Sequence, residues 1–320
     1  MPRIAILDDY QNKSLEAADW TSIPGAEITV FTEFLGHDED RIAEALAGFE
    51  IIVAMRERTR FPASQLEKLT DLKLLVTTGM RNLAIDMDAA RAQGVDVSGT
   101  DMLPYPAFEH AWALILALTK EIPKEDRAMK AGGWQEGFGV GLKGKRLGVL
   151  GLGKLGAQAA TVGLAFGMEV VAWSQNLTDE RAAEVGVARV TKEELFATAD
   201  VITIHLVLSD RTRGLVGTAA FAAMKPSAYI VNTSRGPIID EAALVEALEN
   251  GRIKGAGIDV YDVEPLPEDH PLRRFDNAVL TGHTGYVIAE LYDKVYGQAV
   301  EDIRGWLDGA PERLLNGGET

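Results

Sequence analysis

The stretch Lys145-Arg-Leu-Gly-Val-Leu-Gly-Leu-Gly-Lys-Leu-Gly156 determines how the rest of the chain is organised. We expect Arg146 to Leu150 to form a short buried strand, and Ala157 to Phe166 to form a helix. The glycines between them have the spacing G-x-G-x-x-G, which in a strand–turn–helix context is typical of dinucleotide binding. A glycine-rich turn without a ligand is the alternative interpretation.

Each glycine of this pattern has its own physical role. Gly151 allows a tight turn, Gly153 lets a pyrophosphate approach the backbone, and Gly156 lets the helix pack closely on the strand. Phosphates would bind N–H groups at the helix N-terminus, where the helix dipole favours negative charge. We therefore expect Gly151, Gly153, Lys154, Leu155 and Gly156 to contact the cofactor.

Composition narrows the class of protein. The length of 320 residues allows two domains of ordinary size. The net charge of -16 argues against a nucleic-acid or membrane-surface partner, because both require clustered Lys and Arg. The chain has no cysteine, which excludes disulfides and thiolate chemistry. Its N-terminus lacks a signal pattern, and its longest apolar run, Ala111 to Leu118, is far below the ~20 residues that span a bilayer. We expect a cytoplasmic protein.

The first hundred residues alternate short apolar strands with helices, which predicts a parallel sheet. The expected strands are 4–7, 27–31, 51–54, 72–77 and 95–98, and the expected helices are 38–46 and 62–69. Ligands on such sheets bind beyond the carboxyl ends of the strands.

Two strand ends in this region have residues suited to anion binding. Met55-Arg56-Glu57-Arg58 follows one strand, and Thr78-Gly79-Met80-Arg81-Asn82 follows the next. The second segment can form a nest of backbone N–H groups around a carboxylate, with Gly79 at the turn. We predict that Arg56, Gly79, Met80 and Arg81 bind a small anionic substrate; the alternative is that both arginines are solvated surface residues.

The middle of the chain begins with a connection at Asp101 to Pro106 that we interpret as a domain crossing. Phe108 to Leu118 is apolar on most sides, so we expect a helix that is buried between domains or subunits. His110, near its start, is interpreted as a hydrogen-bonded structural histidine, the alternative being that it approaches the site.

The strand 169–173 ends in Trp173-Ser-Gln-Asn176, where an acid commonly binds the ribose 2′-hydroxyl of NAD. No acid precedes Asp179, and no arginine stands there to bind the 2′-phosphate of NADP. Ser174 and Asn176 can bond either ribose. The cofactor is therefore NAD or NADP, with the preference open.

The second half continues the alternation, with expected strands at 200–205, 228–233, 255–260 and 278–281 and expected helices at 191–198, 219–224 and 240–250. A final amphipathic helix, 290–307, is expected to pack Ile303, Trp306 and Leu307 against the first domain. Residues 309–320 are expected to form a loose tail.

Three chemically active side chains follow separate strands, so they can converge. The planar fork of Arg235 matches a substrate carboxylate, and His283 can give a proton to a carbonyl oxygen as hydride reaches the carbon. Glu264 would orient that imidazole, while Thr233 and Asp259 would lie near the nicotinamide, with Asp259 accepting from its carboxamide. Taken singly, each residue also fits a surface, turn or loop position.

Across nearly its whole length the chain resembles the D-isomer-specific 2-hydroxyacid dehydrogenase family. The matching segments are Gly151–Gly156, Met224-Lys-Pro with Val231-Asn-Thr-Ser-Arg-Gly236, Gly257-Ile-Asp-Val-Tyr with Glu264-Pro-Leu-Pro, and Thr281-Gly-His283. The resemblance implies Arg235, Glu264 and His283 as the catalytic trio and Asp259 on the nicotinamide side. It also implies a homodimer whose cofactor domains meet, with Phe108 to Leu118 in or near that contact.

The implied fold is α/β, with two Rossmann-like or flavodoxin-like parallel-sheet domains and a cleft between them. Residues 1–100 plus 287–320 would form the substrate domain, and 101–286 the dinucleotide-binding domain. The implied activity is hydride transfer between NAD or NADP and a small D-2-hydroxy or 2-keto acid, such as a glyoxylate-, hydroxypyruvate- or phosphoglycerate-like substrate. No metal is expected.

The chain departs from the family pattern in three places: at Ser174 to Asn176, at the glycine before His283, and in the Thr77 to Asn82 loop. Arg81 and Arg56 suggest recognition of a second anionic group, which favours a phosphorylated or dicarboxylic substrate. We expect no regulatory domain after residue 320, which disfavours an amino-acid-regulated phosphoglycerate dehydrogenase.

Two other hypotheses remain open. One is a formate- or phosphonate-type dehydrogenase on the same scaffold, which needs the same cationic anion site. The other is a non-catalytic NAD(H)-sensing, co-repressor-like protein. A sensor needs the glycines but not an acid–base pair, so Glu264 and His283 speak against it.

Overall fold

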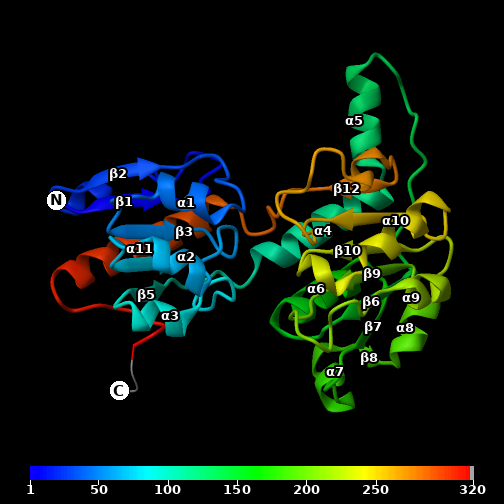
Figure 1. Ribbon diagram of the computed structural model, residues 1–320. Helices are drawn as coiled ribbons and strands as arrows, with labels where there is room; N and C mark the ends of the chain where they lie inside the picture. Colours follow the sequence, from blue (N-terminus) through cyan, green and yellow to red (C-terminus); the bar gives the residue numbers. More distant parts are fainter. Residues whose placement is uncertain (318–320) are drawn as a thin grey trace. The chain divides into compact units, whose positions relative to one another are not determined.

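The computed structural model describes residues 1–317, and the chain divides into two compact units (Figure 1). Unit 1 comprises Met1–Leu103 and the segment from Val287 onward, and unit 2 comprises Pro104–Tyr286. Each unit has one parallel sheet. This confirms the predicted α/β fold class with two parallel-sheet domains.

Unit 1 contains a five-stranded sheet in the order β2-β1-β3-β4-β5. Its elements are β1 (Arg3–Ile6), the short 3-10 helix η1 (Trp20–Ser22), β2 (Glu27–Val30), α1 (Glu39–Ala45), β3 (Ile51–Ala54), α2 (Ala63–Lys68), β4 (Leu74–Thr77), α3 (Met87–Ala92), β5 (Asp96–Gly99) and α11 (Ala289–Leu307). The strands β3 and β4 are buried along their whole length, as expected for the centre of a parallel sheet.

Unit 2 contains a seven-stranded sheet in the order β12-β11-β10-β9-β6-β7-β8. Its elements are α4 (Pro106–Thr119), α5 (Ile122–Lys130), β6 (Arg146–Leu150), α6 (Lys154–Ala165), β7 (Glu169–Trp173), α7 (Asp179–Val185), β8 (Ala188–Arg189), α8 (Lys192–Thr198), β9 (Val201–Ile204), α9 (Thr218–Ala223), β10 (Tyr229–Asn232), η2 (Gly236–Ile238), α10 (Glu241–Glu249), β11 (Gly255–Ile258), η3 (Pro271–Arg274) and β12 (Ala278–Leu280). The strand order reverses between β6 and β9, and ligands of such sheets bind at this point.

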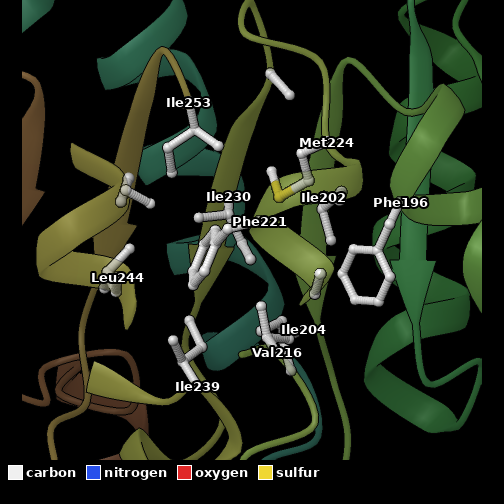
Figure 2. Packing of buried hydrophobic residues seen from close by; sticks show 14 of the residues in the cluster. Phe196, Ile202, Ile204, Val216, Phe221, Met224, Ile230, Ile239, Leu244 and Ile253 are labelled. Atoms are coloured by element: carbon white, nitrogen blue, oxygen red, sulfur yellow. The ribbon is translucent and has the colours of Figure 1, made fainter. Parts of the chain in front are cut away.

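Apolar side chains on both faces of the unit 2 sheet form its core. Figure 2 shows one face of the sheet, where Ile230 of β10 and Ile202 of β9 lie in one cluster with apolar side chains of the covering helices. These are Phe196 of α8, Phe221 of α9 and Met224 at the end of α9. On the other face α4 packs against β10, β11 and α6, and its Trp112 Nε1 donates to Ala159 O at 3.0 Å. The helix is buried as predicted, but by elements of unit 2 itself; its predicted place between domains or subunits stays a prediction.

Within residues 1–317, besides the three short 3-10 helices, α3, α5, α7 and β8 are absent from the predicted pattern. Each of these three α-helices buries a single alanine (Ala90, Ala128 and Ala182), and both residues of β8 are exposed. These elements therefore lack the apolar periodicity that predicts a helix or a strand. The helix expected from Ala157 also begins earlier, at Lys154.

The predicted loose tail is wrong for its described part. Leu315 N–H donates to Val97 O at 2.7 Å, and the Asn316 side chain bonds Val97 N and Val95 O, each at 2.8 Å. The tail therefore supplies hydrogen-bond partners to the edge strand β5. This pairing could not be predicted from the tail's own residues, because β5 is far away in the sequence. Residues 318–320 lie outside the described residues.

The predicted packing of α11 is correct for two residues and wrong for the third. Ile303 is fully buried, and Trp306 Nε1 donates to Asp96 Oδ2 at 2.7 Å. Leu307, the last residue of the helix, is 41% exposed.

No helix within residues 1–317 is long and apolar enough to cross a bilayer. Within the same residues, no group of three or more His, Asp or Glu side chains is arranged to hold a metal ion.

Candidate active site

The glycine-rich turn after β6 has the geometry that its spacing predicts. Gly151 has a φ of 97°, and a Cβ there would lie 2.6 Å from the carbonyl oxygen of His205. A side chain at Gly156 would collide with the carbonyl oxygen of Gly151, so the start of α6 can approach β6 only with glycine here. Gly153 is the N-cap residue of α6.

This turn fits the phosphates of a dinucleotide. A Cβ added at Gly153 would meet no protein atom within 4 Å, so the space in front of the α6 N-terminus is open. The helix has twelve residues, and its dipole favours negative charge at that end. Lys154 and Leu155 form its first turn, where their N–H groups lack intrahelical partners. Unit 2 thus has a turn whose geometry is suited to phosphates at the switch point of its sheet.

At the next strand end, Trp173, Arg189 and Lys192 line a cavity of about 470 Å³. The Lys192 ammonium lies 5.9 Å from the centre of the Trp173 ring, and Arg189 pairs with Asp179 at 3.3 Å. Glu193 and Glu194 line the same cavity. Ser174 is half-buried and Asn176 is exposed beyond β7. The sequence pattern did not indicate these two cations, because Arg189 belongs to the unpredicted strand β8 and Lys192 follows it.

The three predicted catalytic residues follow three neighbouring strands. Arg235 comes after β10, Glu264 after β11 and His283 after β12, and these strands pair in the order β12-β11-β10. Because all three strands are parallel, their carboxyl ends lie at one edge of the sheet. The three residues and the glycine-rich turn therefore all lie at the carboxyl end of the sheet.

His283 and Glu264 form a direct pair. The His283 Nδ1 atom lies 2.6 Å from Glu264 Oε2, and Glu264 Oε1 accepts from Tyr261 N–H at 2.9 Å. A carboxylate can only accept, so Nδ1 carries a proton and Nε2 remains available to a ligand. The side chains are 17% and 28% exposed, so solvent reaches the pair only in part.

Asp259 holds the loop that contains His283. Its carboxylate accepts from Thr281 Oγ1 at 2.6 Å, Thr284 N–H at 2.8 Å and Gly285 N–H at 2.9 Å. Burial favours a raised pKa for Asp259, but hydrogen bonds from His110 and Thr281 and the charge of His110 outweigh burial and hold the pKa below its ordinary value. Asp259 therefore stays ionised.

The end of β10 positions Arg235 and Thr233. Arg235 is half-buried and precedes η2, and its Nη1 donates to Ser234 O at 2.8 Å. The neighbouring Asn232 side chain donates to Arg235 O at 3.0 Å. Thr233 is buried, with its hydroxyl 3.4 Å from Ala107 O. These contacts fix the backbone from which the guanidinium extends.

The predicted substrate residues belong to unit 1, where the structure brings Arg56 and Gly79 together. The guanidinium of Arg56 occupies the space that a Cβ of Gly79 would take, and its Nη1 donates to Thr78 O at 3.2 Å. The Gly79 N–H already donates to Thr100 Oγ1 at 3.2 Å, so one N–H of the expected nest is in use. Met80 is 47% exposed and Arg81 is exposed.

His205, directly after β9, is expected to make the stability of unit 2 depend on pH. Burial lowers the pKa of His205 to about 4, whereas an unfolded histidine titrates near 6.5. Between these values the unfolded chain binds more protons, so stability falls as the pH falls from about 6.5 to about 4, by up to ~3 kcal/mol from this group. We expect His205→Gln to lose that part of the pH dependence, measured by urea unfolding at pH 7 and pH 4.5. The exposed His37→Gln serves as control; equal pH dependence in all three proteins would contradict the assignment.

The partners that sequence reasoning missed lie in the same motifs as the predicted residues. Thr281, Thr284 and Gly285 flank His283, and Tyr261 lies two residues after Asp259. The Tyr261 hydroxyl donates to one of two carbonyl oxygens, Thr281 O at 2.9 Å or Ile258 O at 3.0 Å, and burial raises the pKa of this tyrosine. Their closeness in sequence is the signal that could have identified them.

A turn suited to phosphates at the switch point of a parallel sheet, with a histidine–carboxylate pair at the carboxyl end of the same sheet, is typical of an NAD(P)-binding domain of the dehydrogenase type. Residues 112–285 match the model of the D-isomer specific 2-hydroxyacid dehydrogenase, NAD binding domain. The chain belongs to the D-isomer-specific 2-hydroxyacid dehydrogenase family.

Named relatives support this assignment. The chain is 36% identical over 303 residues to D-3-phosphoglycerate dehydrogenase of Archaeoglobus fulgidus, covering 94% of this chain and 57% of that protein. It is 37% identical over 243 residues to glyoxylate reductase of Aeropyrum pernix, covering 72% of each. The crystal structure of phosphoglycerate oxidoreductase from Vibrio cholerae superposes with a TM-score of 0.91 at 36% identity, over 97% of this chain and 100% of that one. The chain spans about half the length of the phosphoglycerate dehydrogenases that it matches.

Proposed function

We propose that this protein is an NAD(P)-dependent oxidoreductase that interconverts a small D-2-hydroxy acid and its 2-keto acid. The observation that supports this most directly is the 2.6 Å contact of His283 Nδ1 with Glu264, at the sheet edge that also has the glycine-rich turn. A protein that only senses the cofactor would need the turn but not this pair.

The chemistry follows from the residues at that edge. The bound nicotinamide supplies or accepts the hydride at the substrate carbon. In reduction, protonated His283 donates from Nε2 to the carbonyl oxygen, which becomes the hydroxyl, and Glu264 stabilises the imidazolium before the transfer. In oxidation, neutral His283 accepts the hydroxyl proton at Nε2. Arg235 binds the substrate carboxylate through its planar fork.

Asp259 can serve the cofactor as well as the loop. Its Oδ2 accepts one hydrogen bond, from Gly285 N–H at 2.9 Å. A carboxylate oxygen can accept a second, so we propose that Oδ2 accepts from the nicotinamide carboxamide. Thr233 is proposed to lie on the same side of the cofactor.

For the substrate, we propose that Arg56, Gly79, Met80 and Arg81 of unit 1 bind its anionic groups, as their position after β3 and β4 suggests. Since Arg235 is proposed to bind the carboxylate, the half-buried Arg56 and the exposed Arg81 are proposed to bind a second anionic group such as a phosphate. The relatives named as phosphoglycerate enzymes agree with a phosphorylated substrate, and the relative named as a glyoxylate reductase with a smaller one. A formate- or phosphonate-type activity is the alternative on the same scaffold.

The residues of the cavity beyond β7 lead to a prediction about the preference between NADH and NADPH. A 2′-phosphate near Lys192 would gain a charge-assisted contact; no carboxylate directly follows Trp173, and the carboxylates that line the cavity are those of Glu193 and Glu194. We expect Lys192→Glu to weaken NADPH binding about 10-fold and to leave NADH binding within about twofold, measured by titration calorimetry. Lys143→Glu, which makes the same charge change at an exposed position before β6, should affect neither. Equal loss of both cofactors would contradict the prediction.

We further propose a homodimer whose contact includes α5 and the segment after it. This arm projects from the rest of unit 2 (Figure 1) and exposes Ile122, Met129, Trp134 and Phe138, the last at 91%. Exposed apolar side chains gathered on one segment are typical of a protein–protein contact. The neighbouring α4, predicted to lie in or near that contact, is largely buried within unit 2.

The dimer can be tested by light scattering after size exclusion. We expect the wild-type chain to elute as a dimer and Phe138→Asp to elute as a monomer, because a charge would have to be buried in the contact. Leu83→Asp makes the same change at an exposed apolar residue of unit 1 and should leave the mass unchanged. A monomeric wild type, or an unaltered Phe138→Asp mass, would refute this proposal.

The function as a whole is tested by following absorbance at 340 nm. NADH and NADPH are each tested with glyoxylate, hydroxypyruvate, pyruvate, 2-ketoglutarate, oxaloacetate and phosphohydroxypyruvate. Turnover with one acid is the expected result, and Arg81→Ala should then change the preference among these acids. If Arg81→Ala leaves the profile unchanged, the second-anion proposal fails. Cofactor binding in a thermal-shift assay without any turnover would instead favour a sensor.

A further inference from the structure

The helix α4 places an imidazole beside the carboxylate that holds the His283 loop. His110 Nε2 lies 2.9 Å from Thr281 Oγ1 and 3.3 Å from Asp259 Oδ1. The His110 side chain is 20% exposed and Asp259 is 1% exposed, so little water competes for these contacts. His110 reaches the loop from a helix far away in the sequence, and the proposed mechanism does not use it.

The direction of these hydrogen bonds follows from the inventory of donors. The Thr281 hydroxyl has one proton, and its 2.6 Å distance to Asp259 Oδ1 shows that it donates there. The same hydroxyl must then accept from His110, so Nε2 of His110 carries a proton. The relay runs from His110 to Thr281 to Asp259, and each step strengthens the next.

The other end of this relay is the backbone that contains His283. His283 has a φ of 54°, a left-handed conformation that costs free energy for a residue other than glycine and persists only when its surroundings enforce it. Asp259 enforces it by accepting from the N–H groups of Thr284 and Gly285, and His283 N–H donates to Asp259 O at 2.7 Å. A Cβ at Gly285 would lie 2.9 Å from Asp259 Oδ2 and 3.5 Å from His110 Cδ2, so the loop lies directly against both side chains.

We propose that His110 is a positioning residue: its Nε2–H, acting through Thr281 and Asp259, holds the 281–285 loop so that His283 presents Nε2 to the substrate. The expected effect on catalysis rests on the function proposed above. The expected effect on the loop does not, because it needs no substrate. It extends the prediction that His110 is a hydrogen-bonded structural histidine, because the group to which it is bonded belongs to the active site.

The kinetic test compares two replacements of His110. His110→Phe keeps a flat ring but removes the donor, and His110→Gln places an N–H donor near the position of Nε2. We expect His110→Phe to lower kcat about 10- to 100-fold with KM and cofactor Kd within about threefold, because a small misplacement of a catalytic group has this scale of effect. His110→Gln should recover most of kcat. His37→Phe, an exposed histidine of unit 1, is the matched control.

A second readout does not need turnover. Amide hydrogen exchange of peptides covering 281–287 should be at least about 10-fold faster in His110→Phe than in the wild type, and near the wild-type rate in His110→Gln. If His110→Phe is poorly folded, Thr281→Val removes the relay and should give the same local increase in exchange. Unchanged exchange in a folded His110→Phe, or equal loss of kcat in the Phe and Gln variants, overturns the proposal. Faster exchange in a protein that turns over none of the acids would overturn the proposed function alone.

Discussion

Replacing His283 by glutamine is expected to lower kcat by a factor of about 10² to 10⁴ while cofactor Kd stays within about twofold. Glutamine can still donate to Glu264, which His283 Nδ1 contacts at 2.6 Å, but it cannot give a proton to the substrate oxygen or take one from it. The loss therefore falls on proton transfer. Steady-state kinetics with NADH or NADPH and the acid found in the screen measure kcat, and calorimetry measures Kd.

Unit 2 offers a matched control for this variant. His270 contacts Glu241 at 2.9 Å in the same kind of histidine–glutamate pair, but it begins the short helix η3. His270→Gln removes an imidazole from such a pair and should leave kcat within about threefold. A His283→Gln enzyme that keeps more than about a tenth of wild-type kcat would show that another group transfers the proton.

Replacing Arg235 by leucine is expected to lower kcat/KM by a factor of about 10³. The half-buried guanidinium is proposed to make two parallel hydrogen bonds to the substrate carboxylate, and charge-assisted bonds of this kind are each worth ~1.5–3 kcal/mol. Arg235→Lys keeps the charge but not the planar fork, so its loss should be intermediate. Most of the loss should appear in KM if the carboxylate is bound equally in the ground state and the transition state.

The control for Arg235→Leu is Arg181→Leu, an exposed arginine of α7 that pairs with Glu184 at 2.7 Å. It should leave kcat/KM within about twofold. Cofactor Kd should stay near the wild-type value in both variants. If Arg235→Leu weakened the cofactor and the substrate equally, the residue would serve the fold of the β10 loop and not the carboxylate.

The strands and the site motifs could be predicted because their signals are local. A strand of a parallel sheet is buried on both faces, so β3 is apolar throughout, and β4, β9 and β10 each contain a single Thr or Asn among apolar residues. The turn at Gly151 and Gly156 could be predicted for a similar reason, since its backbone excludes any side chain. Helices such as α7, which buries only Ala182, gave no such signal.

The sequence by itself determined the α/β class, the dinucleotide turn and the residue types of the site, because each depends on neighbours within a few positions along the chain. Only the tertiary structure decided that His110 of α4 reaches Asp259, and that Asn316 completes the edge of β5. Hydrogen bonds act over about 3 Å in space, whatever the distance along the chain. Which partners come within that range is decided by the packing of whole elements, and no local pattern records that packing.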